Sequence, residues 1–548
     1  MHELAKSIDH SALPSTDGGR MESNSRQRWM LLLIFAGMAS LQIGLATRQC
    51  LWVDEIFSLA LATGHSLEQP AAAADPARGD FVELDHPVRA EQLRRYLSHE
   101  HPPAGPARVL RAVLLSDTSP PLYYLFLYFW TLILGTSDIA LRLFSVFWTL
   151  ACFPLIADIA RRTGGTRAVL PACVLFALSP LVLYFSGEGR MYSLLLLCLL
   201  ATASVSLALH AEGGGTTRYV LWIVASAAGF LTHYFFIFSW AAMVIFLMIF
   251  PGRLQRRNLI GAIVVLALAI SPWFLVARSS IGHWRITQGW LNLRPSGFHR
   301  SRTIRNDFLQ FFSGGAGLWS SERWSSYAAT ALFAFVALAA AWRLRLRAFA
   351  GPRLLLWLWF IVSCSAPIVI DLLQHTYVSN NPRYVIAALP AAYLLAAIAF
   401  SVLDRRICVS LLLLIALVWV VPITAIYKQR YRTGDPFETM AQTVTSSSNL
   451  SDLILVHSIP SGVLGIARYA DGASNIASWV QQLGTRRVPE SLLTLAVGRS
   501  RIRFVKVHQL SEPSPEEDWL RTNAVLSREI PFQFGLTADF RPMNSDTF

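Results

Sequence analysis

The chain has 548 residues, of which 54% are hydrophobic and only 15% are charged. A soluble domain usually carries about 25% charged residues, so the composition excludes an ordinary soluble protein and predicts a polytopic membrane protein. The formal net charge of +13 comes almost wholly from arginine. Because no basic stretch is interleaved with aromatic residues as a base-stacking surface would be, nucleic acid is not an expected partner.

Apolar runs along the chain predict transmembrane helices, since a span needs roughly 20 apolar residues. The first run lacks a small-residue cleavage site, so we expect a retained span rather than a signal peptide. The eleven expected spans cover residues 29–46, 139–160, 168–186, 191–210, 219–233, 234–250, 259–276, 327–342, 354–374, 385–403 and 407–427.

Arginine clusters orient these spans, because basic loops stay on the cytoplasmic side of a membrane. Arginines gather in residues 161–167, 253–257, 343–353 and 405–406, and few lie in the loops between. The sequence therefore predicts a cytoplasmic N-terminus and an outer C-terminus.

One further run, "PPLYYLFLYFWTLILGTS" (residues 120–137), is apolar enough to span. A crossing there would move the later arginine clusters to the wrong side. We therefore predict a juxtamembrane helix at the outer interface, where its tyrosines and Trp130 suit the headgroup level.

The predicted domains follow from these assignments. Residues 428–548 are polar, with short apolar strands such as "LILVH" (453–457) and "IRFVKV" (502–507), and predict a small soluble α/β domain on the outer side. The expected order is a cytoplasmic tail (1–28), an all-α transmembrane domain (29–427) with large outer segments (47–138 and 277–325), and the α/β domain (428–548).

Charged and polar residues converge on the outer ends of the expected spans. Charges at membrane depth are costly and are candidates for function, and independent structural residues would scatter over both faces. The candidates are Asp54, Glu55, Asp117, Glu188, Arg190, Tyr192, His233, Arg383 and Tyr384.

The acidic candidates also have plain structural interpretations. Glu55 could pair with Arg48 or Arg190, and Glu188 could simply neutralise Arg190, two residues away. Asp117 could cap the helix that is expected to begin near the following prolines.

The basic candidates leave similar alternatives open. His233 could be a hydrogen-bonded histidine between helices, and Arg383 could merely end a loop. Guanidinium groups nevertheless match phosphate in bidentate geometry, so Arg190 and Arg383 suit a lipid phosphate.

Five motifs in chain order carry a family resemblance: "WVDEIFSLA", "SPPLYYLFLYFW", "ALRLFSVFWTL", "LSPLVLYFSGEGRMYSLLLL" and "LTHYFFIF". They resemble the bacterial membrane glycosyltransferases of the GT-C fold, which are related to protein mannosyltransferases and to the lipid A aminoarabinose transferase. The resemblance covers residues 29–250 well, and "NPRYVIAALPAAYLL" (381–395) adds a weaker match. It does not extend to the C-terminal domain.

The resemblance implies transfer of a sugar, with inversion, from a polyprenyl-phosphate donor at the outer face of a bacterial cytoplasmic (inner) membrane. Asp54 is then the general base, because a carboxylate can take the proton of an attacking hydroxyl. Glu55 could be a second catalytic acid or a metal-binding acid. The other candidates would contact the substrate or the lipid phosphate. A lipid, a glycan or a protein remains open as acceptor, with membrane lipids as further partners.

A divalent metal is an open alternative, with Asp117 and His283 as candidate ligands. The chain departs from the family pattern at Ser119, where a histidine sometimes stands, and in the run Gly-Glu-Gly-Arg (187–190), where the family often has Gln-Glu-Ala-Arg. A transporter or lipid flippase, and a lipid-linked glycan ligase or polymerase, are the alternative functions.

Overall fold

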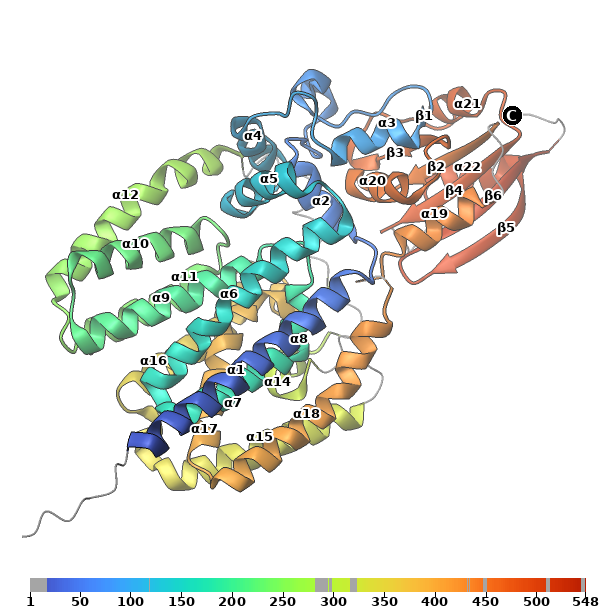
Figure 1. The fold of residues 1–548 in the computed structure, drawn as a ribbon. Helices are drawn as coiled ribbons and strands as arrows, with labels where there is room; N and C mark the ends of the chain where they lie inside the picture. Colours follow the sequence, from blue (N-terminus) through green and yellow to red (C-terminus); the bar gives the residue numbers. More distant parts are fainter. Residues whose placement is uncertain are drawn as a thin grey trace, which may run out of the picture.

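The computed structural model describes residues 17–548 apart from 118, 281–293, 295–297, 316–322, 431, 433, 447–450, 509–512 and 544–547. A bundle of long helices carries a small α/β domain at one end (Figure 1). The helices of the bundle are α1 (Asp17–Ala46), α6 (Asp138–Gly164), α7 (Thr166–Leu178), α8 (Pro180–Ser186), α9 (Tyr192–Glu212), α10 (Thr216–Phe230), α11 (Phe236–Ile249), α12 (Arg256–Ser280), α15 (Arg323–Leu344), α16 (Pro352–Gln374), α17 (Leu389–Ser401) and α18 (Arg405–Lys428).

Each of the eleven predicted spans coincides with one of these helices, with α7 and α8 together forming the third. In the described part of the chain, seven helices are long and apolar enough to cross a membrane, or eight if α7 and α8, bent by 54°, form one span. Helices α10, α11 and α17 have 15, 14 and 13 residues and fall short of a full crossing length. The chain is thus a multi-pass, mostly helical membrane protein.

The contacts between helix termini distinguish the two ends of the bundle. At one end the arginine clusters meet: Arg162 forms an ion pair with Glu212 at 2.9 Å, and Arg353 donates to the Thr163 carbonyl at 3.2 Å. At the other end the side chain of Gln49 donates to the carbonyl of Gln429 at 3.0 Å, joining the chain after α1 to the chain after α18. We call this second end, which also holds the α/β domain, the site end (Figure 1).

Three short helices of the first large loop pack at the site end: α2 (Val53–Ala62), α4 (Pro106–Ser116) and α5 (Leu122–Leu134). Helix α5 has 13 residues and a length of about 20 Å, which is too short for a bilayer core of about 30 Å. The indole of Trp130 donates to the Ala140 carbonyl at 2.8 Å, which fixes α5 against the first turn of α6. The position of α5 at the membrane interface stays a prediction.

The α/β domain contains a six-stranded sheet in the order β1 (Val88–Arg89), β3 (Asn475–Trp479), β2 (Asp452–His457), β4 (Arg501–Val507), β6 (Gly535–Pro542) and β5 (Ala524–Phe532). Strands β3, β2 and β4 are parallel, and Leu455 of β2 lies opposite Ala477 and Phe504. The two strands predicted from the sequence are β2 and β4.

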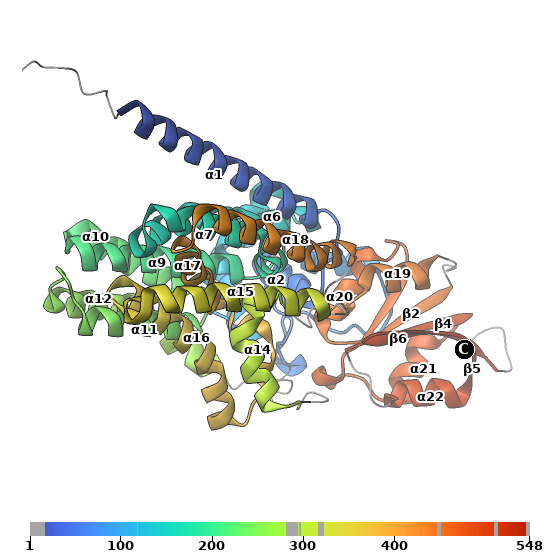
Figure 2. The same ribbon diagram turned by 90° about the horizontal axis from the view of Figure 1, so that it is seen from below.

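Helices cover both faces of this sheet (Figure 2). Side chains of β2 alternate between the faces: Ile454 and Val456 join the core shared with α19 (Phe437–Thr445) and α20 (Pro460–Tyr469), whereas Leu453 and Leu455 join a second core. Helices α21 (Glu490–Ala496) and α22 (Pro515–Asn523) supply that second core.

The sheet extends beyond the expected domain boundary at residue 428. Its edge strand β1 comes from the first large loop and pairs with β3, Val88 opposite Ile476. Nearby, Glu83 of the same loop accepts a hydrogen bond from the Val480 backbone at 2.8 Å. The first large loop therefore contributes a strand to the C-terminal sheet and packs as part of that domain.

Candidate active site

Helix α2 presents the two adjacent acids at its first turn. Trp52 is the N-cap residue, and the Glu55 carboxylate reaches back to accept the Trp52 N–H at 3.2 Å. Acids are stabilised in a first turn because the unpaired N–H groups and the helix dipole favour negative charge. The motif "WVDEIFSLA" is therefore also a helix-start signal.

Asp54 is the accessible member of the pair. Its side chain is 27% exposed, and its Oδ2 lies 2.9 Å from Arg383 Nη1 and 3.9 Å from Arg190 Nε. Arg383 comes from the 3-10 turn Pro382–Tyr384, 329 residues away in the chain. The structure thus brings together the predicted base and both predicted phosphate-binding arginines.

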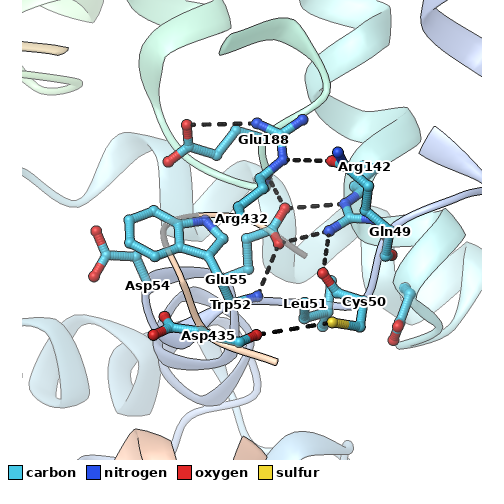
Figure 3. Close-up of polar contacts among 12 residues, drawn as sticks. Gln49, Cys50, Leu51, Trp52, Asp54, Glu55, Arg142, Glu188, Arg432 and Asp435 are labelled. Carbon is cyan, nitrogen blue, oxygen red and sulfur yellow. Dashed lines mark hydrogen bonds and ion pairs between the residues drawn. The ribbon is translucent and has the colours of Figure 1, made fainter. Parts of the chain in front are cut away.

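Glu55 is fully buried and its carboxylate is saturated. Arg142 of α6 holds both of its oxygens, Nε to Oε1 at 3.1 Å and Nη2 to Oε2 at 2.8 Å (Figure 3). The Gly189 N–H also donates to Oε1, at 2.8 Å. The ion-pair partner is therefore Arg142, rather than Arg48 or Arg190 as the sequence suggested. In Figure 3 the Asp54 carboxylate points away from this network.

Arg190 is the buried arginine beside Asp54. It is 8% exposed, and its Nη1 donates to Ser58 Oγ and to Tyr124 Oη, each at 3.1 Å. The hydroxyl of Tyr124 donates in turn to Asp117, whose Oδ2 lies 3.7 Å from Arg190 Nη1. The Nε of Arg190 is buried without a hydrogen-bond partner among the described residues, so this guanidinium has unused donor capacity.

Glu188 faces a different arginine. Its Oε2 lies 3.9 Å from Nη1 of Arg432, which follows α18 and whose Nε donates to Gln49 Oε1 at 2.8 Å (Figure 3). Burial raises the pKa of Glu188 to about 7, although Arg432 opposes the shift. Among the described residues, Glu188 and Arg190 form no ion pair with each other, so the mutual neutralisation considered from the sequence is not seen.

Aromatic side chains line the site beyond Arg383. The Arg383 guanidinium lies 5.2 Å from the Tyr384 ring centre, and that ring lies 5.2 Å from Phe235. His233 Nδ1 accepts the Phe235 N–H at 3.1 Å, and its ring lies 6.1 Å from that of Tyr192. Because Nδ1 accepts this backbone N–H, the ring proton of the neutral imidazole lies on Nε2, which can donate to a ligand.

The residues around Asp117 do not fit a divalent metal. The two carboxylate oxygens accept hydrogen bonds from the Ser119 N–H at 2.9 Å and from Tyr124, and a guanidinium lies beside them. In the part of the chain that the structure describes, no three His, Cys, Asp or Glu side chains gather closely enough to hold a metal ion. His283 lies outside the described residues.

Several residues of the site were missed at the level of sequence. Arg142 had a usable signal, because it is an arginine inside the apolar run "ALRLFSVFWTL", where a charge is costly. Tyr124 was treated only as an interfacial aromatic, and Arg432 carried no local signal, because its role depends on a contact with Gln49, 383 residues away.

Comparisons with known proteins agree with this architecture. Residues 118–275 match the family model of the dolichyl-phosphate-mannose-protein mannosyltransferases. The apo crystal structure of ArnT from Cupriavidus metallidurans aligns with a TM-score of 0.58 and 12% identity over 94% of this chain and 98% of that chain. ArnT bound to undecaprenyl phosphate aligns with a TM-score of 0.58 and 13% identity over 95% and 99% of the two chains.

A search of curated proteins found no match to the chain. The family model and the shared fold together confirm the predicted resemblance to the membrane glycosyltransferases of the GT-C fold.

Proposed function

We propose that the protein transfers a sugar from a polyprenyl-phosphate donor to an acceptor hydroxyl at the outer face of a bacterial inner membrane. The observation that carries this proposal is one accessible carboxylate, Asp54, beside the guanidinium groups of Arg190 and Arg383. A base and a phosphate clamp are what a single displacement on a lipid-phosphate sugar requires. The matching family model is named for a dolichyl-phosphate sugar, and ArnT was solved with undecaprenyl phosphate.

The two arginines would bind the donor phosphate. Arg383 pairs with Asp54 in this structure, and a lipid phosphate would compete with Asp54 for that guanidinium. Arginine binds phosphate oxygens through two parallel N–H donors, and buried Arg190 still has donor capacity at Nε. Donor binding would thus release Asp54 from its ion pair when a base is needed.

Asp54 would then take the proton of the acceptor hydroxyl. The acceptor oxygen forms a bond to the anomeric carbon while the bond from that carbon to the phosphate oxygen breaks. The electron pair of the broken bond leaves with the lipid phosphate, whose growing charge Arg190 and Arg383 stabilise. The proton ends on the Asp54 carboxylate, and attack opposite the leaving group inverts the anomeric configuration.

The remaining candidates would orient the donor. With Nδ1 of His233 accepting the Phe235 N–H, the neutral imidazole offers Nε2–H. Tyr192 lies beside His233 and Tyr384 lies beside Arg383, so these groups suit hydroxyl or phosphate oxygens of a sugar phosphate. Glu55 would act through Arg142 and the backbone rather than by touching substrate, since its carboxylate is fully buried.

The arrangement does not favour a transporter. A transport path needs polar groups through the depth of the bilayer, typically at broken helices near its middle. The ion pairs of Asp54, Asp117 and Glu188 instead lie in loops and short helices at the site end.

The test is sugar transfer in proteoliposomes supplied with a radiolabelled polyprenyl-phosphate sugar and membrane lipid acceptors. Asp54→Asn should lower kcat by about 10²- to 10⁴-fold, the usual contribution of a general base. The matched control is Asp85→Asn, which changes an acid of the same loop whose side chain is 91% exposed. An undiminished kcat in Asp54→Asn would exclude Asp54 as the general base. If the wild-type protein transfers no sugar from any donor supplied, the proposed glycosyltransferase activity is wrong.

A further inference from the structure

The segment just before α2 is held by the chain that leads into the C-terminal domain. The backbone N–H of Cys50 donates to the Arg430 carbonyl at 3.0 Å. The N–H of Leu51 donates to Tyr469 Oη of α20 at 2.8 Å, and the N–H of Val53 donates to Asp435 Oδ2 at 3.1 Å. The start of the helix that carries Asp54 is therefore fixed from outside the membrane bundle.

Asp435 is the central residue of this attachment. It is 2% exposed, and its Oδ1 accepts a hydrogen bond from His508 Nε2 at 2.9 Å while its Oδ2 accepts from Val53. The carbonyl of Asp435 also faces Cys50 Sγ at 3.9 Å. One buried carboxylate thus joins the first residue of α2 to the sheet domain.

His508 is held in an uncommon conformation that aims its ring at Asp435. It follows β4 directly and has φ of 69°, in the left-handed region that non-glycine residues seldom occupy. Its N–H donates to the Phe534 carbonyl at 3.0 Å, and its Nδ1 lies 3.3 Å from Ser458 Oγ at the end of β2. Contacts from two neighbouring strand ends therefore orient the imidazole.

The hydrogen-bonded series Ser458–His508–Asp435 also resembles a catalytic triad of nucleophile, base and acid. Ser458 is only 3% exposed, and a Cβ placed on Gly462 would stand 2.0 Å from its Oγ, so helix α20 closes over the hydroxyl. The second oxygen of Asp435 is committed to α2. The geometry favours a positioning network over a second active site.

We infer that Asp435, oriented by His508, is a positioning residue through which the C-terminal domain places Asp54 for sugar transfer. The inference rests on the proposed function. Asp54 directly follows Val53, whose N–H the Asp435 carboxylate accepts, so loss of that acceptor loosens the first turn of α2. A displacement of about 1 Å at a reacting group can lower a rate by about 10²-fold.

The experiment compares Asp435→Ala with Asp435→Asn in the full-length protein. Alanine removes the acceptor for Val53 N–H, whereas asparagine keeps an acceptor oxygen and its amide can donate to His508 in the other imidazole tautomer. Asp435→Ala should lower kcat by about 10- to 100-fold with donor KM changed less than about threefold, and Asp435→Asn should recover most of kcat.

Glu83→Gln is the matched control, because Glu83 also joins the first loop to the C-terminal domain but contacts Val480 and Thr485 rather than α2. Wild-type kcat in Asp435→Ala, an equal loss in Glu83→Gln, or no recovery in Asp435→Asn would each overturn the inference.

A second readout separates this inference from the proposed function. Hydrogen exchange of a peptide containing Val53 should be at least about tenfold faster in Asp435→Ala than in the wild type and unchanged in Glu83→Gln. If the wild-type protein transfers no sugar, the proposed function fails and the exchange result alone decides whether Asp435 holds α2. Unchanged exchange in Asp435→Ala would overturn the attachment itself.

Discussion

Asp54 and Glu55 are consecutive residues in opposite environments: the Asp54 side chain is 27% exposed beside two arginines, whereas Glu55 is fully buried against Arg142. Successive residues of a helix point about 100° apart, so one first turn can offer one acid to substrate and one to the core. Asp54 is thus the candidate base, whereas Glu55 supports the segment that carries Asp54.

Replacing Glu55 should lower the stability of the folded protein rather than remove a group that takes part in the reaction. Glu55→Gln would leave Arg142 fully buried without its counter-charge, and breaking a buried pair costs about 3–5 kcal/mol. We expect a large drop in thermal unfolding temperature in detergent. Asp54→Asn, at a partly exposed position, should leave that temperature nearly unchanged.

A stability rescue sharpens this test. The double variant Glu55→Leu with Arg142→Met removes both charges and should recover part of the lost stability. A Glu55→Gln protein that unfolds like the wild type but has lost kcat would instead make Glu55 a catalytic acid.

Arg383→Lys should weaken donor binding although it keeps the charge. A lysine ammonium cannot reproduce the two parallel donors that a guanidinium offers to phosphate. We expect donor KM to rise by about tenfold, corresponding to about 1.4 kcal/mol, in transfer assays at several donor concentrations. Arg468→Lys is the matched control, since Arg468 of α20 in the C-terminal domain pairs with Asp138 at the start of α6. An equal KM change in Arg468→Lys would argue against a phosphate role for Arg383.

The sequence predicted the helical architecture because transmembrane helices carry their own signal. Apolar runs of span length and clustered arginines are local features, and all eleven runs became helices. Helix α5 was predicted to lie at the interface by counting crossings rather than by composition. Residues in the turns between spans, such as Glu188 and Arg383, could be predicted as candidates because charge is costly near lipid.

The partners of those residues depend on contacts between distant segments. Glu55 finds Arg142, 87 residues away, and Asp54 finds Arg383, 329 residues away, so no spacing rule could select these pairs. The strand β1 was missed for the same reason, since two residues of a loop become a strand only beside β3. The role of Asp435 likewise appears only when α2 and the C-terminal sheet lie together.

Tyr124→Phe should disturb the site through Arg190. The hydroxyl bridges Arg190 Nη1 at 3.1 Å and the Asp117 carboxylate, so its loss leaves two buried charged groups with one hydrogen bond fewer each. A hydrogen bond to a charged group contributes about 1.5–3 kcal/mol, so kcat/KM should fall by at least about tenfold. Tyr128→Phe, one turn further along α5, should leave kcat/KM unchanged; equal effects of the two substitutions would exclude a specific role for Tyr124.

Glu188 should make the stability of the protein depend on pH. Burial raises the pKa of Glu188 from 4.5 to about 7 in the folded protein, so the folded state binds this proton more tightly than the unfolded state. The stabilisation from the proton is therefore fully present below about pH 4.5 and is lost as the pH rises through about 7. Wild-type protein should accordingly unfold at a lower temperature at about pH 8 than at about pH 6, and Glu188→Gln should remove part of this dependence of unfolding temperature on pH.

Glu83, whose pKa burial also raises to about 7, adds a similar pH dependence in both proteins, so the difference between them isolates Glu188. Identical slopes in the two proteins would show that Glu188 is ionised across this range and held by Arg432 instead.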